Sequence, residues 1–178
     1  ITVTSLPGAC ACITALTMSG QPTRRFAFEA FLPYDKKERT QILENLRNET
    51  RTIIIYEAPH HLKKTLKECR EYLGNRNMTV CKELTKRYEQ KRKSTLDEMI
   101  DYYEENEPRG EYVLIFEGKS LQELKEEKQQ EWNQLTVQEH MEHYLEKGMD
   151  KKSAMKQVAQ DRGVSKLSLI HISEPTRL

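Results

Sequence analysis

The stretch Thr52-Ile53-Ile54-Ile55-Tyr56-Glu57-Ala58-Pro59-His60 decides the fold, because a β-branched apolar run ends abruptly in polar residues and a proline. The run over Thr52–Tyr56 is long enough for a buried strand. Pro59 restricts Ala58 to extended backbone and suits the first turn of a following helix. The pattern predicts that helix over Leu62–Leu73. A strand followed at once by a helix indicates an α/β fold.

Glu57 and His60 directly follow this strand and therefore lie at the edge of the predicted sheet. In open α/β sheets, polar groups at the carboxyl ends of strands converge on ligands outside the sheet. We interpret both residues as candidate catalytic groups. The alternative is a charged strand end beside a capping imidazole, which is the better reading for an isolated Glu or His.

Short apolar runs alternate with helical patterns along residues 1–118. The runs predict strands at Thr2–Ser5, Phe26–Phe31, Thr52–Tyr56, Met78–Cys81 and Tyr112–Phe116. Helices are predicted at Cys10–Ser19, Lys36–Asn48, Leu62–Leu73 and Thr95–Glu104. This alternation is typical of an α/β layer structure.

The residues after 118 have a different, helical pattern. Residues 119–134 predict a charged helix that serves as a linker. Within residues 135–166, Thr136 and Glu139 form a capping-box pattern, and Asp150 can cap a second helix. Ser165 would cap a third helix after a glycine turn, which is typical of a helix-turn-helix nucleic-acid module. A small spacer or dimerising bundle is the alternative.

Residues 167–178 read as a translated sequencing-library adapter, so we exclude them from the fold. A natural disordered tail is the alternative. Upstream, His140 and His143 lie three residues apart without a third ligand, which indicates a solvated helix face rather than a metal site. We expect no metal.

Composition narrows the class of protein. The net charge is +1, the charged fraction is 32% and no apolar run has the length of a membrane span. The four cysteines show neither zinc-site spacing nor a secreted disulfide framework, so we expect free thiols in the cytoplasm. Ile1 opens inside a strand-like run, which leads us to expect a piece of a longer protein.

Two further segments place polar or backbone groups near the same edge. Leu6-Pro7-Gly8 joins the first predicted strand to a helix of small residues, where backbone N–H groups can meet a ligand. Lys82-Glu83-Leu84-Thr85-Lys86 follows the fourth predicted strand. We hypothesise that Glu83 and Lys86 share one crevice with Glu57 and His60.

In order along the chain, several motifs resemble one family. They are Leu-Pro-Gly at 6–8, Gly-x-Pro-Thr at 20–23, Phe-x-Phe-x-x-Phe-Leu-Pro at 26–33, Tyr-Glu-x-Pro-His at 56–60, Lys-Glu-Leu-Thr-Lys at 82–86 and Arg-Gly-Glu-x-Val-Leu at 109–114. The set is similar to the ribosomal RNA ribose methyltransferases of the tetrapyrrole methylase superfamily, over residues 4–166.

The resemblance implies the second domain of such an enzyme, a mixed five-stranded sheet with flanking helices, followed by a small helical module. It implies S-adenosylmethionine as cofactor and small-subunit ribosomal RNA as partner. The reaction it implies is methyl transfer to the ribose 2′-hydroxyl of a cytidine, and a homodimer is expected. A fragment without the preceding domain would be inactive.

Residue by residue, the resemblance assigns a set of cofactor contacts and a set of catalytic groups. The cofactor contacts are Leu6, Pro7, Gly8, Ala15, Leu16 and Tyr56. The catalytic candidates are Glu57, His60, Glu83 and Lys86. The chain departs from the family pattern at Ala9-Cys10, at His61 and at Lys93-Ser94. His61 replaces a common arginine and with it a bidentate phosphate donor.

The chemistry requires alignment of donor and hydroxyl and removal of the hydroxyl proton. Glu57, His60 and Glu83 are candidate bases, and Lys86 could hold a phosphate or act as base if burial lowers its pKa. A tetrapyrrole methylase and a non-catalytic RNA-binding module remain alternatives. The helical appendage favours a macromolecular substrate.

Overall fold

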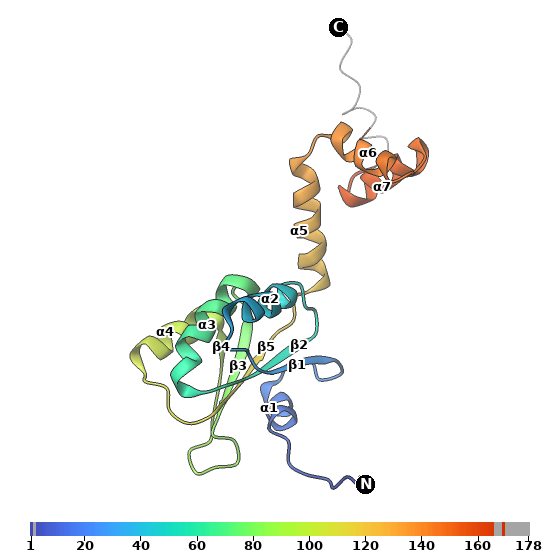
Figure 1. Ribbon diagram of the computed structural model, residues 1–178. Coiled ribbons are helices and arrows are strands. Elements are labelled where there is room, and N and C mark those ends of the chain that lie inside the picture. The colour runs from blue at the N-terminus through green and yellow to red at the C-terminus, as the bar shows by residue number, and fades with distance from the viewer. Residues whose placement is uncertain (2, 166–168, 170–178) are drawn as a thin grey trace. The chain divides into compact units, whose positions relative to one another are not determined.

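The computed structural model describes residues 1, 3–165 and 169. The chain divides into two compact units, Ile1–Lys119 and Ser120–Leu178 (Figure 1). The first holds the sheet, and the second holds helices.

The first unit contains a mixed five-stranded sheet in the order β1-β2-β5-β3-β4. The strands are β1 (Phe26–Phe31), β2 (Thr52–Glu57), β3 (Asn77–Lys82), β4 (Gln90–Thr95) and β5 (Tyr112–Phe116). β1 runs parallel to β2, whereas the β2–β5, β5–β3 and β3–β4 pairs are antiparallel. The expected α/β class with a mixed five-stranded sheet is confirmed.

The identity of one strand differs from the prediction. Val3–Ser5 form no strand, so the prediction at Thr2–Ser5 is wrong there, and Thr2 lies outside the described residues. Val3 is 88% exposed and so gains nothing from burial that would favour a strand. The missed strand is β4, whose sequence Gln-Lys-Arg-Lys-Ser-Thr is largely exposed at the sheet edge. Such a strand lacks apolar alternation, and its lysines discourage further strand pairing.

Helices cover both faces of the sheet (Figure 1). They are α1 (Ala11–Ser19), α2 (Lys36–Leu46), α3 (Pro59–Leu73) and α4 (Leu96–Glu105). Side chains alternate along β2, so Ile53 and Ile55 pack in the core beneath α2, α3 and α4. Ile54 packs on the other face, in the core with α1. Burial on both faces explains the continuous apolar run of β2.

Helix α3 begins earlier than the apolar pattern predicts. Pro59 occupies its first turn, after Ala58 in extended backbone, as the proline suggested. The helix therefore starts at Pro59 rather than Leu62, and His60 lies within its first turn. This places the imidazole directly at the sheet edge where β2 ends.

The second unit is built from α5 (Leu121–Gln134), α6 (Val137–Glu146) and α7 (Lys151–Asp161). Capping boxes start α5 and α6, and the Asp150 carboxylate caps α7. The small core of this unit contains Val158, Ala159 and Leu169, with Val137, Met141 and Tyr144 against it. The predicted third helix and the adapter-like residues 167–178 lie outside the described residues, apart from Leu169.

His140 corrects the prediction of a solvated histidine face. Its side chain is fully buried, and its ring stacks on Trp132 with centroids 3.9 Å apart. Arg162 Nε donates to His140 Nδ1 at 3.2 Å. Trp132 of α5, the helix predicted as a charged linker, thus covers His140 of α6. The spacing of residues within α6 cannot show this, because the covering side chain comes from another helix.

Candidate active site at the carboxyl ends of the strands

The strand register brings the two predicted polar motifs to one edge of the sheet. Glu57 at the end of β2 pairs with Tyr112 of β5, which pairs in turn with Lys82 at the end of β3. Glu83 follows Lys82 immediately. Since neighbouring strands lie about 4.8 Å apart, the ends of β2 and β3 are separated by about 10 Å.

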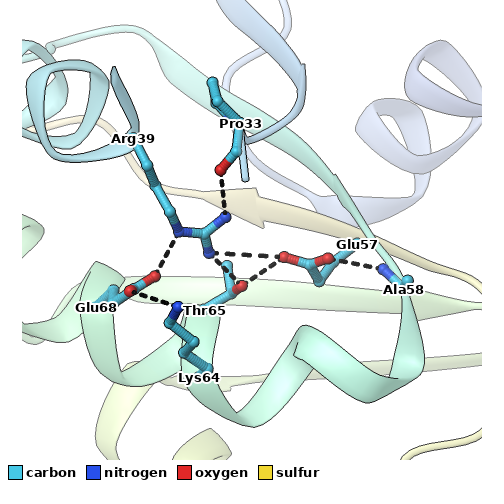
Figure 2. A network of polar contacts seen from close by, with 7 residues as sticks. All are labelled: Pro33, Arg39, Glu57, Ala58, Lys64, Thr65 and Glu68. Atoms are coloured by element: carbon cyan, nitrogen blue, oxygen red, sulfur yellow. Dashed lines mark hydrogen bonds and ion pairs between the residues drawn. The ribbon is translucent and has the colours of Figure 1, made fainter. Parts of the chain in front are cut away.

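Glu57 lies inside a buried polar network on the α2–α4 side of the sheet (Figure 2). Its Oε1 accepts from the Ala58 N–H at 2.8 Å, and its Oε2 accepts from the Thr65 hydroxyl. Arg39 Nη2 donates to Thr65 Oγ1 at 2.6 Å and lies 3.9 Å from Glu57 Oε2. The Glu57 side chain is only 5% exposed. It is therefore a fixed, buried carboxylate.

Arg39 ties this network to α3 and to the segment after β1. Arg39 Nε donates to Glu68 Oε2 at 2.6 Å, and Nη1 reaches the Pro33 carbonyl at 3.5 Å. Glu68 also pairs with Lys64 at 3.7 Å. Figure 2 shows the guanidinium at the centre of these groups. The network balances the Glu57 charge, which burial alone would penalise.

The sequence reading missed Arg39 and Thr65. Thr65 is fully buried on the apolar face of α3, at helical spacing from Leu62, Leu66 and Cys69. A hydroxyl on an otherwise apolar helix face was the available signal, because a buried hydroxyl requires a hydrogen-bond partner. No local pattern points to Arg39, which is one of several basic residues in α2.

His60 is exposed in the first turn of α3, and its ring lies beside that of His61, with centroids 4.2 Å apart. The His61 ring also meets Tyr34 edge-on at 5.4 Å. The three rings form a continuous row from the segment after β1 to the start of α3. His60 is thus the accessible member of the Glu57–His60 pair.

Glu83 and Lys86 form a second cluster with Glu111. Lys86 Nζ lies 3.1 Å from Glu83 Oε1 and 2.8 Å from Glu111 Oε2. Bonding to Glu111, and then to Glu83, raises the pKa of Lys86, so it stays a cation rather than a base. The Glu111 N–H and Lys86 lower the pKa of Glu83, which therefore stays ionised.

Gly110 makes room for this second cluster. Gly110 has a φ of +83°, and a Cβ there would meet Glu83 Cγ at 2.6 Å. Glu83 itself has a φ of 50°, in the left-handed region. The Arg-Gly-Glu motif and the Lys-Glu-Leu-Thr-Lys motif are therefore in direct contact. The missing side chain of Gly110 leaves the space that the Glu83 side chain occupies.

The four candidate catalytic residues share a sheet edge without forming one hydrogen-bonded group. Among the contacts of the described residues, Glu57 is joined to Thr65, and Glu83 is joined to Lys86. Strand β5 separates the two clusters. The hypothesis of one shared crevice therefore requires a substrate long enough to reach both.

The predicted cofactor turn precedes α1, on the other face of the sheet from Glu57. Leu6 is 89% exposed, and apart from Gly8 and its two chain neighbours no described residue comes within 4 Å of the position that a Cβ would take at Gly8. The Tyr56 hydroxyl accepts from the Cys12 N–H at 2.9 Å, which fixes the start of α1 over the end of β2. An open turn beside a helix start leaves backbone N–H groups accessible to a ligand.

Ala15 and Leu16 lie in the core rather than at this turn. Ala15 is fully buried and Leu16 is 3% exposed, both packed with Ile54 and Ile115. Their side chains therefore position α1 against the sheet. Leu6, Pro7 and Gly8 are the exposed members of the predicted cofactor set.

A cavity of about 420 Å³ lies beside the Glu57 network. Arg39 and Glu57 line it together with the aromatic residues Phe31, Tyr34 and His61. Across the part of the chain that is described, no cluster of three or more His, Cys, Asp or Glu residues could hold a metal ion. Within the same part, no helix has the length and apolar character needed to cross a membrane.

Comparison with known proteins gives one family match and several similar proteins, all of them methylases or methyltransferases by name. Residues 1–100 match the protein family described as Tetrapyrrole (Corrin/Porphyrin) Methylases. Several similar curated proteins share the name ribosomal RNA small subunit methyltransferase I. That of Halalkalibacterium halodurans is 44% identical over 97% of this chain and 59% of its own length. That of Bacillus subtilis is 46% identical over 92% of this chain and 56% of its own length.

The protein of that name from Synechocystis sp. is 37% identical over 97% of this chain and 61% of its own length. The chain therefore spans between 56% and 61% of the length of these three relatives. The matched share of this chain includes both compact units.

Proposed function

The chain belongs to the tetrapyrrole (corrin/porphyrin) methylase family, and from that premise we propose that the whole protein transfers a methyl group from S-adenosylmethionine to small-subunit ribosomal RNA. The observation that carries this proposal is the 37–46% identity, over at least 92% of the chain, to relatives named for that RNA. We further propose the ribose 2′-hydroxyl of a cytidine as the acceptor.

S-adenosylmethionine supplies an activated methyl group on a sulfonium when it is bound. Leu6, Pro7 and Gly8 would form one wall of its site, because they are exposed beside the start of α1. Tyr56 would hold that wall in place through its bond from the Cys12 N–H. The remainder of the site is proposed to come from the part of the protein that the chain does not span.

His60 is the proposed base that removes the ribose proton. It is exposed where β2 ends, whereas the Glu57 side chain is only 5% exposed and is held by Ala58 and Thr65. General-base catalysis by a positioned side chain contributes about 10²–10⁴-fold. His60→Gln should reduce turnover by about that factor and leave cofactor affinity, measured by calorimetry, unchanged. A proportional loss of cofactor affinity would assign His60 to binding instead.

Lys86 is proposed to hold an RNA phosphate near the reacting nucleotide. Its pKa is raised by Glu111 and Glu83, so it carries a positive charge at neutral pH. Glu83 would then act as a positioning residue, because its side chain packs against Gly110 and accepts a hydrogen bond from Lys86. We propose that the helical module at 135–166 adds RNA contacts, that the protein is a homodimer, and that it acts in the cytoplasm.

Transfer of a tritiated methyl group to immature small ribosomal subunits by the full-length protein tests the proposal. Ribose methylation removes the hydroxyl needed for alkaline cleavage, so the label should appear in alkali-resistant dinucleotides. Label in alkali-sensitive nucleotides would retain RNA methylation and overturn the ribose assignment. Label in an added tetrapyrrole, with none in RNA, would support the rival enzyme class. Binding of RNA with neither product labelled would support a non-catalytic module.

A further inference from the structure

We propose that the cavity beside Glu57 receives an unstacked cytosine base of the RNA and that Glu57 and Arg39 read its hydrogen-bonding edge. This inference rests on the proposed function and specifies the substrate that the site accepts. The cavity volume of about 420 Å³ is sufficient for a single nucleobase and its ribose.

Aromatic rings form the walls of this cavity. Tyr34 is 85% exposed and meets the His61 ring edge-on at 5.4 Å, and Phe31 lines the same cavity. Proteins that recognise RNA sequence stack unpaired bases on aromatic side chains of this kind. Tyr34 contributes little to the core, because so much of its surface is in solvent. The rings therefore offer a stacking surface at the mouth of a polar cavity.

The polar floor of the cavity presents an acceptor beside a donor. The Glu57 carboxylate accepts from Ala58 and Thr65, and a carboxylate has capacity for further bonds. Arg39 Nη2 is shared between Thr65 Oγ1 and, at 3.9 Å, Glu57 Oε2, whereas Nη1 makes one long bond of 3.5 Å to the Pro33 carbonyl and carries a second N–H. Both side chains line the cavity, so these free positions are available to a ligand.

This pair matches cytosine and not uracil. The exocyclic amine of cytosine donates a hydrogen bond, and a Glu carboxylate is its usual protein acceptor. The adjacent ring nitrogen and carbonyl of cytosine accept, as the Arg39 N–H groups require. Uracil has a carbonyl in place of the amine and an N–H in place of the ring acceptor. The carbonyl would face the Glu57 carboxylate, acceptor against acceptor, and the N–H would face the Arg39 N–H groups, donor against donor.

The location of the cavity also agrees with the proposed chemistry. His61 lines the cavity, and its ring lies 4.2 Å from that of His60, the proposed base. A nucleobase held between the aromatic walls would keep its own ribose near the sheet edge. Lys64 lines the same cavity and is 68% exposed, so it can meet a neighbouring phosphate.

Equilibrium binding of labelled RNA hexamers to the full-length protein tests this inference without any methyl transfer. Two hexamers are compared, one with cytidine and one with uridine at a single position. All other positions are abasic, so the two strands differ only in that one base. The wild-type protein should bind the cytidine strand about 10-fold more tightly, the effect of one good base contact. Glu57→Gln should bring this ratio close to one, because an amide can serve either base.

Tyr34→Ala provides a second test that does not disturb the buried network. It should weaken binding of both strands by about 10-fold through loss of stacking, and Tyr34→Phe should restore the affinity. An equal affinity of the wild-type protein for the two strands would overturn the inference, as would a cytidine preference that survives Glu57→Gln in a folded protein. Unchanged binding by Tyr34→Ala would do the same. Absence of RNA methylation with the cytidine preference intact would instead count against the proposed function alone.

Discussion

Tyr56 and Glu57 are adjacent in the chain, yet they anchor opposite faces of the sheet. The Tyr56 hydroxyl accepts from the Cys12 N–H at the start of α1, whereas the Glu57 carboxylate accepts from Thr65 in α3. Side chains alternate along a strand, so two neighbouring residues can connect two different helices to one strand end. One peptide bond therefore joins the residue that holds the start of α1 to the residue that lines the cavity proposed for the nucleobase.

Thr65 is expected to be worth more to stability than an ordinary buried hydroxyl. It accepts from Arg39 and donates to Glu57, so Thr65→Val leaves two buried charged groups with fewer partners. We expect a loss of about 2–3 kcal/mol in the free energy of unfolding, measured with urea. Thr79→Val is the matched control, because Thr79 is equally buried but donates only to the Ser19 carbonyl.

The control should cost about 1 kcal/mol. Equal losses for the two threonine variants would show that the Glu57 charge does not depend on the Thr65 hydroxyl.

Gly110→Ala should destabilise the first unit through two effects. The φ of +83° disfavours any side chain, and the new Cβ would meet Glu83 at 2.6 Å. The backbone effect costs about 1–2 kcal/mol, and the clash adds about 1–3 kcal/mol. Gly20→Ala is the control, since it has a φ of +73° but its nearest neighbour lies at an ordinary 3.9 Å. Urea unfolding should rank Gly110→Ala as the more damaging change, and the reverse order would contradict this account.

Lys86→Met should weaken RNA binding in a salt-dependent manner. A lysine whose pKa is raised by Glu111 and Glu83 stays charged, and loss of one phosphate contact lowers the slope of log affinity against log salt by about 1. Lys67→Met is the control, because Lys67 is also exposed and paired, with Glu104. A similar change in slope for both variants would indicate a general charge effect.

The cysteines should differ sharply in their reaction with iodoacetamide. A hydrogen bond from the Ile13 backbone, and then one from Cys12, lowers the pKa of the exposed Cys10 thiol. Burial raises the pKa of Cys69 to about 12 and that of Cys81 to about 11. Since the thiolate is the reactive form, Cys10 should be alkylated first near neutral pH, as mass spectrometry would detect.

Cys69 and Cys81 should react only after unfolding. Fast native labelling that persists in Cys10→Ser would show that another thiol is the reactive one.

His140 should make the second unit less stable in mild acid. Burial, and then the charge of Arg162, lowers the pKa of His140, while Asp161 opposes this shift. The unfolded chain therefore binds a proton near pH 6.5 that the folded unit does not, so stability is complete above that pH and declines below it. Thermal unfolding should show a lower Tm at about pH 5.5 than at about pH 7.5.

His140→Phe keeps a ring against Trp132 and should reduce this pH dependence. His143→Gln, which changes a half-buried histidine on the same helix, should leave it in place. An unaltered pH dependence in His140→Phe would assign the effect to other groups.

Local patterns determined the helix starts and much of the sheet. Pro59 marked the first turn of α3, Thr136 and Glu139 predicted the start of α6, and the helix predicted from Thr95 was found as α4. These features depend on residues within one turn of each other, which sequence displays directly. The buried run of β2 was equally visible, because burial on both faces requires apolar residues throughout.

Contacts between distant residues were decided by the tertiary structure. Arg39 meets Thr65 and Glu57 across separate elements, and β4 exists because β3 supplies its hydrogen-bonding partners rather than because its own residues favour a strand. His140 is buried only because Trp132 of another helix covers it. The sequence by itself determined which residues end a strand or begin a helix, since those choices depend on backbone sterics and near neighbours. Only the folded chain decided which of those residues are buried and paired, because burial depends on what the rest of the chain places against them.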